Sequence, residues 1–175
     1  MRKGSCLVCG TLAMKLCSGC KTALYCNRGH QKQDWRSHKE YCVKVQNAKN
    51  TFDAILFAAD EIEPRLVKIP WEFKEGEWHD LDRSVWFKNP RSFVRNLSVS
   101  PTLCFLYDDH FGENGSQRNG CIDVFTGGNP GRPWAGNILA LRKGDSDLYD
   151  FFDNVDMDED FLPLVRFFER YGRRG

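Results

Sequence analysis

The sequence predicts a protein of the α+β class, in which a small cysteine-rich module precedes a mixed, mainly antiparallel sheet domain that ends in a helix. Three observations support this prediction. Six of the eight cysteines lie in the first 42 residues of the 175-residue chain, several apolar runs between residues 65 and 141 have the length of strands, and apolar residues recur at helical spacing near the end. A chain of this length suits one ordinary domain plus a small module.

The charges divide the chain in the same place. Residues 1–44 carry nine Lys/Arg and two Asp/Glu, whereas residues 45–175 carry sixteen and twenty-two. We therefore expect a basic module at 1–44 and an acidic α+β domain of unknown function at 45–175. No apolar run reaches the roughly 18 residues of a membrane-spanning helix, and the first residues lack the apolar stretch of a secretory signal. These features predict an intracellular protein without membrane contact, in the nucleus or the cytoplasm.

Eight cysteines and histidines of the basic module have the spacing of metal ligands. Two Cys-x2-Cys pairs can each place two thiolates on one ion from a tight turn. The pairs Cys26/His30 and His38/Cys42 are four residues apart, which puts both members on one face of a helix. Eight ligands suffice for two closed tetrahedral zinc sites. The eight are Cys6, Cys9, Cys17, Cys20, Cys26, His30, His38 and Cys42.

A disulfide framework is the main alternative interpretation of these cysteines. It needs an oxidising compartment and gives the two histidines no role, and iron–sulfur clusters mostly take four thiolates, so zinc is favoured. Gly10 and Gly19 lie where the Cys-x2-Cys turns need a permissive backbone. A module of about 40 residues buries too little apolar surface to fold alone, so zinc would supply most of its folding free energy. Four protein ligands per ion leave no position for a reactive water, which makes the predicted zinc structural.

The run from Tyr25 to Cys42 resembles a MYND-type zinc finger. The Tyr-Cys, the Gln-x3-Trp, the His-Lys-x2-Cys and the order of the eight ligands match that family's pattern over residues 6–42. The resemblance implies short hairpins plus helices, two Zn2+ and interleaved ligation, although spacing alone would also allow sequential sites. His30 stands where the family usually has cysteine, and imidazole binds zinc well. The first zinc would take Cys6, Cys9, Cys26 and His30, and the second would take Cys17, Cys20, His38 and Cys42.

MYND fingers are protein-interaction modules, so the resemblance implies a protein partner with a proline-containing peptide motif of the Pro-x-Leu-x-Pro kind. The positions that match the family's peptide contacts are Gln31 and Trp35, with Tyr25 on the strand around residues 22–25 as the expected edge. An extended peptide can add to a strand edge, and an aromatic face suits a proline-rich segment. The alternatives are that Trp35 packs the small core and that Gln31 is plain surface. We expect an adaptor, with transcriptional regulation as a candidate process.

The net charge of +7 on residues 1–44 gives a second hypothesis, a nucleic-acid-associated regulator that uses the basic face of the finger. Basic residues are also expected beside zinc-bound thiolates, because they offset the thiolate charge. The aromatic residues do not alternate with the basic ones as a stacking platform requires, so nucleic acid is the less favoured partner.

Residues 45–175 resemble no characterised family, although the layout is similar to fungal MYND-finger proteins. We expect residues 43–60 to continue the last helix of the finger. Apolar residues from Phe161 to Phe168 recur at helical spacing and predict a C-terminal helix. The residues expected to bound it are Asp158 or Asp160 at the N-cap, Pro163 in the first turn and Gly172 at the end. Strands are expected at residues 65–69, 102–107, 121–125 and 137–141.

An enzyme with its site in residues 45–175 is the third hypothesis, and we expect that the protein is not an enzyme. The chain lacks the Asn-His-Ser-Cys order of the methyltransferases that accompany some MYND fingers, and it has no Gly-x-Ser-x-Gly elbow. Cys104 and Cys121 lie in apolar runs and are predicted to be buried. His79, His110 and Cys104 could form a catalytic set by residue type alone. The glycine-rich loop at 127–133 lacks a phosphate-binding ending, and the acidic residues from 145 to 160 are expected to be solvated.

Overall fold

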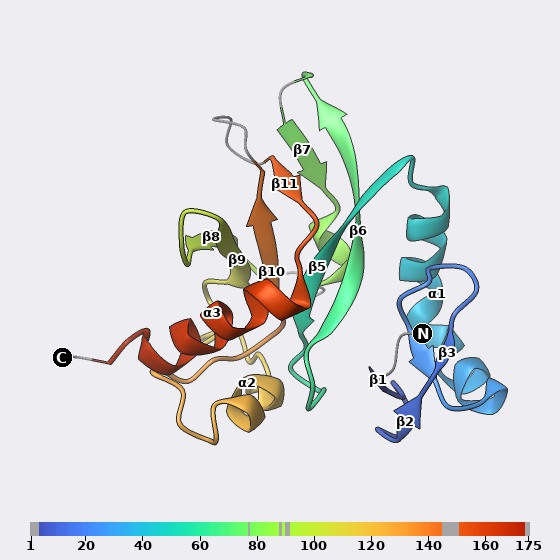
Figure 1. Cartoon of the computed structure of the whole chain (residues 1–175), viewed down its shortest axis with the longest axis horizontal. Helices are drawn as coiled ribbons and strands as arrows, with labels where there is room; N and C mark the ends of the chain where they lie inside the picture. Colours follow the sequence, from blue (N-terminus) through green and yellow to red (C-terminus); the bar gives the residue numbers. More distant parts are fainter. Residues whose placement is uncertain (1–3, 77, 88, 90–91, 145–150, 174–175) are drawn as a thin grey trace.

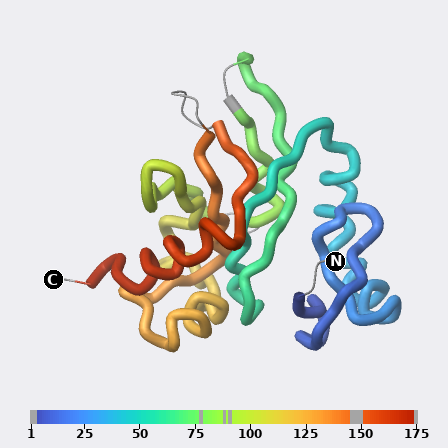
Figure 2. The backbone as a smooth tube through the Cα atoms, in the orientation of Figure 1, coloured from blue at the N-terminus to red at the C-terminus, as the bar shows by residue number. Residues whose placement is uncertain are grey.

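The computed structural model of the chain describes residues 4–76, 78–87, 89, 92–144 and 151–173. A curled sheet lies in the middle of the molecule (Figure 1). Residues 4–47, which we call the finger, lie along one side of this sheet, and two helices lie on the other side (Figure 2). The structure is α+β, as the sequence predicts.

The finger consists of four very short strands and one long helix. Strands β1 and β2 pair with each other, as do β3 and β4, and both pairs are antiparallel. The helix begins after Asn27, whose side chain accepts a hydrogen bond from the His30 N–H at 2.9 Å. The elements are β1 (Gly4–Ser5), β2 (Leu12–Ala13), β3 (Lys15–Leu16), β4 (Leu24–Tyr25) and α1 (Arg28–Asn47).

The central sheet has seven strands in the order β7-β6-β5-β10-β9-β8, with β11 also paired to β10. Its neighbouring strands run antiparallel, and the pairing of Phe57 with Ile138 joins β5 to β10 across a long stretch of sequence. The strands are β5 (Asn50–Phe57), β6 (Arg65–Lys74), β7 (Trp78–Leu81), β8 (Val94–Ser98), β9 (Leu103–Asp108), β10 (Ile138–Lys143) and β11 (Phe152–Asp153). The remaining elements are a 3-10 turn at Arg83–Val85, α2 (Gly120–Phe125) and α3 (Met157–Arg170).

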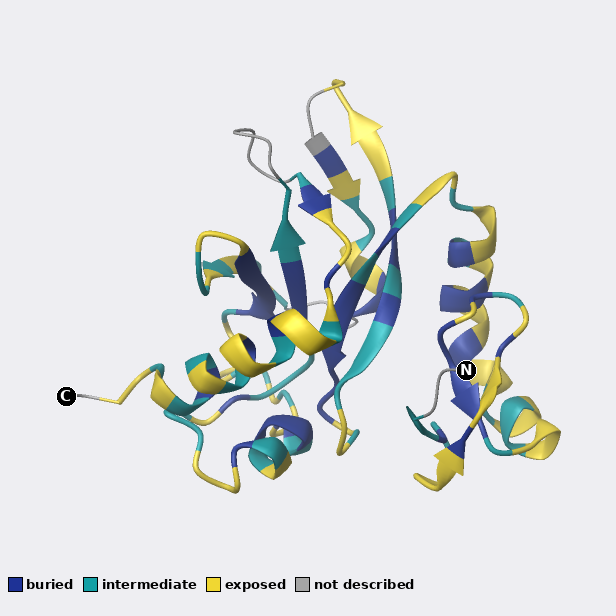
Figure 3. Cartoon of the chain, in the orientation of Figure 1, coloured by how far each residue is buried: buried dark blue, intermediate teal, exposed yellow. Residues whose placement is uncertain are grey.

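The central sheet has two apolar faces, because successive apolar residues along its strands point to opposite sides. On one face, Leu56, Leu106 and Leu139 pack in one cluster with Tyr41 and Val45 of α1. On the other face, residues such as Phe57 and Phe105 pack with α2 and with Leu164 and Phe168 of α3. Since successive strand residues point to opposite faces, strands buried on both sides read as continuous apolar runs. The buried residues shown in Figure 3 run along the sheet and along the side of α1 that faces it.

The strands expected at 65–69, 102–107 and 137–141 are confirmed as β6, β9 and β10. Two expectations are wrong. The helix does not continue through the whole of residues 43–60, because α1 ends at Asn47 and an apolar strand follows from Asn50. Residues 121–125 form helix α2, not a strand, because the buried Asn119 side chain accepts from the Ile122 N–H at 2.9 Å and caps a helix there.

The C-terminal helix is confirmed, but it begins earlier than expected. Asp156 is its N-cap, and its carboxylate accepts from the backbone N–H groups of Asp158 and Glu159. Asp160 is buried and accepts from Arg142 at 2.8 and 3.0 Å, so it fixes the helix to β10. Pro163 therefore lies inside the helix, beyond its first turn. Asp145, Asp147 and Asp150 of the acidic stretch lie outside the described residues.

Candidate metal centres and interaction surface

The two Cys-x2-Cys pairs lie on turns of the same geometry. In the first turn the Gly10 N–H donates to the Cys6 carbonyl at 2.9 Å, and in the second the Lys21 N–H donates to the Cys17 carbonyl at 3.0 Å. The last residue of each turn has a left-handed backbone, with φ of 70° at Gly10 and 58° at Lys21. Both turns therefore present their two thiols to the same side of the chain.

Gly19 has a different role from the one that the sequence predicts, since Lys21 supplies the left-handed residue of its turn. A Cβ atom on Gly19 would lie 2.7 Å from Sγ of Cys42 and 2.6 Å from Nε2 of Gln46. The missing side chain thus lets α1 approach the second turn. This approach brings Cys42 to the thiols of that turn.

The first cluster joins the first turn to the start of α1. The ligand atoms of Cys6, Cys9, Cys26 and His30 all lie within 4.8 Å of one another. Sγ of Cys9 is 3.7 Å from Sγ of Cys26, and Sγ of Cys6 is 3.6 Å from Nδ1 of His30. Tetrahedral zinc with ordinary bond lengths requires about 3.8 Å between two sulfurs and about 3.6 Å between sulfur and nitrogen. The distance from Sγ of Cys26 to Nδ1 of His30, 3.0 Å, is shorter than such an edge.

The second cluster joins the second turn to the middle of α1. The ligand atoms of Cys17, Cys20, His38 and Cys42 also lie within 4.8 Å of one another. Sγ of Cys17 is 3.6 Å from Sγ of Cys42, and Sγ of Cys20 is 3.5 Å from Nε2 of His38. His38 and Cys42 lie one turn apart on the buried face of the helix. Both donor sets therefore suit zinc in number and chemistry, and, apart from the short distance between Cys26 and His30, in spacing.

The ionisation of the thiols also fits a bound cation. Burial opposes ionisation of the Cys20 thiol, but hydrogen bonds from His38 and the backbone around Ala23 outweigh burial and lower the Cys20 pKa to about 6. Burial and the neighbouring Cys17 raise the pKa of Cys42 to about 11. The protein groups thus favour a thiolate at Cys20 and a thiol at Cys42. A divalent cation can hold both as thiolates.

The two clusters differ in exposure. In the first, Cys9 is exposed and Cys26 and His30 are half-buried, whereas all four residues of the second are buried. The second cluster lies between the turn of the finger and the helix face that packs on the sheet. The first cluster therefore faces solvent, and the second is part of the joint between finger and sheet.

Tyr41 connects the second cluster to the sheet, a role that the sequence did not reveal. Its hydroxyl accepts from the Lys68 N–H at 3.0 Å, donates to the Lys68 carbonyl at 3.2 Å and lies 3.0 Å from Oγ1 of Thr22. Oγ1 of Thr22 in turn donates to Sγ of Cys20 at 3.3 Å. The Tyr41 ring meets the ring of Trp86 edge-on with centroids 5.0 Å apart. The feature of the sequence that could have indicated this role is an aromatic residue, Tyr41, directly before the last ligand, Cys42.

The residues predicted to contact a peptide are placed in different environments. Trp35 is 41% exposed, so it does not pack in the core, and Gln31 is half-buried one turn before it. Tyr25 is 1% exposed, and its hydroxyl donates to Asp34 at 2.6 Å, so its side chain belongs to the core. Burial and the Asp34 carboxylate raise the pKa of Tyr25 well above its usual range.

The strand edge expected at residues 22–25 is already paired. Strand β4 pairs with β3 on one side, and on the other its Leu24 carbonyl accepts from the Leu7 N–H at 3.1 Å. Within the described part of the chain, β3 pairs with β4 alone. In the β3–β4 hairpin, the edge that can accept another strand is therefore that of β3.

The residues of the hypothetical catalytic set are not brought together. His79 lies on β7 and Cys104 on β9, four strand positions away, which corresponds to about 19 Å at about 4.8 Å per strand. The His79 ring stacks on Trp71 with centroids 3.9 Å apart, and that of His110 stacks on Phe93. Cys104 and Cys121 are fully buried, as expected, and burial raises the pKa of Cys121 to about 12.

Comparison with known proteins identifies the N-terminal module. Residues 6–42 match the family model of the MYND finger. Programmed cell death protein 2 of Bos taurus is 36% identical over 124 residues, which cover 58% of this chain and 36% of that protein. The Mus musculus protein of the same name is 36% identical over 75 residues, covering 37% of this chain and 22% of its own length. Egl nine homolog 1 of Homo sapiens is 45% identical over 44 residues, covering 25% of this chain and 10% of its own length.

Residues 6–42 are thus a MYND finger, a zinc-binding protein-interaction module, and its two donor clusters are those of two Zn2+. The chain spans about a third, or less, of the length of these curated relatives. No solved structure matches the chain. Within the described residues, no helix is long and apolar enough to cross a membrane.

Proposed function

We propose that this chain is an intracellular adaptor whose finger docks a short proline-containing segment of a partner protein. The observation that carries the proposal is the exposure of Trp35, 41%, on a helix whose position depends on both zinc clusters. Tryptophan is enriched among the residues that contribute most to binding at protein interfaces, and exposed aromatic side chains anchor many of them. We propose a role in transcriptional regulation as the process this adaptor serves.

We also propose which residues bind each of the two zincs. The turns and α1 bring each set of donor atoms together, so the ions fix the helix against the hairpins. The ions would supply folding free energy and no chemistry, because four protein ligands leave no open position. The first zinc is assigned to Cys6, Cys9, Cys26 and His30, and the second to Cys17, Cys20, His38 and Cys42.

The position of Trp35 suits an extended peptide beside the hairpin. Its ring lies 6.1 Å from the ring of His38, which lies 6.1 Å from the ring of Tyr25 on β4. Tyr25, buried as it is, would support the docking surface from below instead of contacting the peptide. Next to β4, strand β3 offers an unpaired edge, and the exposed Met14 and Leu16 add apolar surface there. A proline-rich segment needs little ordering before it binds such an aromatic and apolar surface.

The sheet domain would act as the rigid support of the finger and as a second contact surface. Zinc-bound thiolates and cysteines outside disulfides, such as Cys104 and Cys121, persist where cysteines stay reduced, which agrees with an intracellular location. The basic module at 1–44 and the acidic domain at 45–175 are proposed as the two functional parts, although the boundary between them falls inside α1.

Trp35→Ala is expected to weaken binding of a labelled Pro-x-Leu-x-Pro peptide by about tenfold or more, because aromatic anchors at interfaces commonly contribute about 2 kcal/mol or more. Gln31→Ala should weaken it less, through loss of a hydrogen-bonding side chain. Fluorescence anisotropy on the zinc-loaded whole chain measures both. Val43→Ala is the matched control, since Val43 lies on the same helix and is 40% exposed. If the Trp35→Ala variant retains two zincs and binds the peptide as tightly as the parent, the docking proposal is wrong.

A nucleic-acid-associated role is a second candidate, and a separate observation favours it. Arg28, Lys32, Arg36 and Lys39 are exposed and follow one another at spacings of four, four and three along α1, which places them on one face. If this stripe binds phosphates, affinity for a DNA or RNA duplex should fall with a log–log salt slope of about −3 to −4 for four contacts. Absent binding, or binding that does not respond to salt, rules this candidate out.

A further inference from the structure

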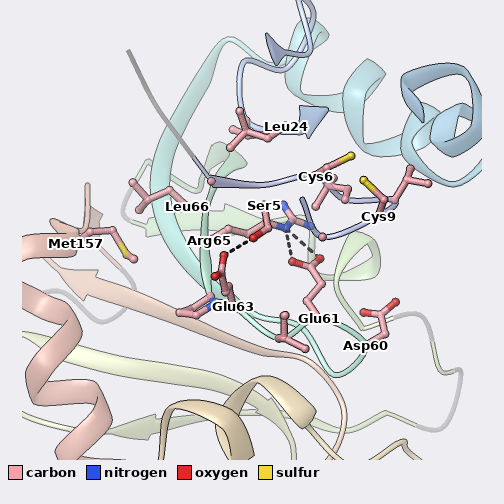
Figure 4. Close-up of a pocket in the computed structure, with 17 residues that line it drawn as sticks. Ser5, Cys6, Cys9, Leu24, Asp60, Glu61, Glu63, Arg65, Leu66 and Met157 are labelled. Atoms are coloured by element: carbon pink, nitrogen blue, oxygen red, sulfur yellow. Dashed lines mark hydrogen bonds and ion pairs between the residues drawn. The ribbon is translucent and has the colours of Figure 1, made fainter. Parts of the chain in front are cut away.

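A groove separates the finger from the sheet on the side of the first cysteine turn. It encloses about 550 Å³. The finger contributes residues 4–10, Thr22 and Leu24 to its lining. The sheet side contributes residues 60–64 of the β5–β6 connection, residues 65–66 at the start of β6 and Met157 at the start of α3. Figure 4 shows the two walls, with Leu24, Cys6 and Cys9 on the finger side and Asp60, Glu61 and Glu63 on the β5–β6 connection. A space of this size holds one or two side chains of a bound peptide.

The lining of the groove includes apolar side chains from both parts of the chain. Leu24 is buried at one side, Leu66 and Met157 are half-buried, and Ile62 is 59% exposed at the rim. Exposed isoleucine beside a concave apolar lining is a feature of surfaces that bury on association. An apolar side chain from a partner would be desolvated between these residues.

The charge of the groove is negative and partly uncompensated. Both carboxylate oxygens of Glu61 accept from Nε of Arg65, at 3.0 and 2.8 Å, so this pair is internally neutral. Glu63 accepts from the hydroxyl of Ser5 across the groove. Within the described part of the chain, neither Asp60 nor Glu63 takes part in an ion pair, and both are exposed. Two negative charges therefore remain available at the rim.

We propose that this groove is a second docking site, which binds a partner segment carrying one apolar side chain flanked by Lys or Arg. The apolar residue would occupy the space between Leu24 and Leu66, and the flanking cations would pair with Asp60 and Glu63. The same carboxylates repel acidic peptides and phosphate backbones, so the groove selects against the ligands that the basic face of α1 attracts. The site is distinct from the Trp35 surface, and its existence does not depend on the docking role of Trp35.

The test uses a labelled peptide with one leucine between two lysines on each side, titrated with the zinc-loaded whole chain in fluorescence anisotropy. Binding should be saturable and should weaken with salt. The double variant Asp60→Lys with Glu63→Lys should weaken it by about tenfold or more, because attraction at two rim positions becomes repulsion. Glu72→Lys with Asp153→Lys is the matched control, since both are exposed, lie outside the groove and change the net charge equally.

Three further measurements separate the outcomes. Ile62→Ser should weaken binding without any change of charge, and a peptide with serine in place of leucine should bind less tightly than its parent. Trp35→Ala should leave binding of the lysine–leucine peptide unchanged, which distinguishes this site from the proline-peptide surface. Equal affinity of the two lysine double variants, or equal binding of a peptide with glutamate in place of lysine, overturns the proposal. Zinc content and circular dichroism confirm that each variant is folded.

Discussion

Cys42→Ser is expected to remove the second zinc and to unfold the finger. Sγ of Cys42 lies 3.6 Å from Sγ of Cys17 in the fully buried cluster, and Nε2 of Gln46 donates to it at 3.2 Å. Structural zinc in small fingers contributes about 10–16 kcal/mol, which equals or exceeds the whole stability of an ordinary domain, about 5–15 kcal/mol. The finger has no comparable source of stability, because it forms only two-residue strands and one helix.

The measurement is zinc per chain by mass spectrometry, together with limited proteolysis of the finger. Cys9→Ser provides the contrast, because Cys9 is an exposed member of the first cluster. The Cys9→Ser variant should lose one zinc while α1 stays packed on the sheet. The Cys42→Ser variant should also expose the sheet face that includes Leu56 and Leu139. Retention of two zincs and of protease resistance by Cys42→Ser would show that the second cluster does not hold the finger together.

Tyr41→Ala is expected to destabilise the whole chain by about 3–5 kcal/mol, the usual cost of removing a buried aromatic side chain. The ring is 8% exposed and packs edge-on against Trp86, so its loss leaves a cavity between finger and sheet. Tyr41→Phe separates packing from hydrogen bonding. It leaves the Lys68 N–H without its acceptor and should cost about 1–3 kcal/mol.

Urea unfolding of the zinc-loaded chain measures both Tyr41 variants. Val43→Ala, on the exposed side of the same helix, should change stability by no more than about 0.5 kcal/mol. A double-mutant cycle with Trp86→Ala should reveal coupling, because the two rings are in contact. A Tyr41→Phe variant as stable as the parent would show that the bonds to Lys68 do not contribute to the joint.

The finger could be predicted from sequence because its chemistry is local. Cysteine pairs separated by two residues and ligands one helical turn apart predict metal clusters from spacing alone. Local rules also place β9 and β10 close to their observed bounds, and they find the start of β6, which runs on past Pro70 to Lys74, and the presence of α3. Local rules fail at residues 121–125, because five apolar and acidic residues suit a strand and a short helix equally well. Asn119 as N-cap favours the helix.

The joint between finger and sheet could not be predicted, since it depends on contacts between distant residues. The pairing of β5 with β10 places Ala54 and Leu56 on one face, and that face is covered by α1. The sequence does not show that Tyr41 contacts the sheet, because its partner Lys68 lies beside it only in the folded chain. Likewise, the groove with Asp60 and Glu63 is formed only where the finger and the sheet meet.

Docking of a proline-containing peptide at Trp35 can be tested by mapping the residues that the peptide contacts. A Pro-x-Leu-x-Pro peptide is titrated into the isotope-labelled, zinc-loaded chain, and amide and indole N–H resonances are followed by two-dimensional NMR. We expect saturable shifts at Gln31, at the indole of Trp35 and along Lys15–Leu16 of β3, with the groove at residues 60–66 unaffected. Absence of shifts at Trp35, or shifts confined to other surfaces of the chain, would contradict it.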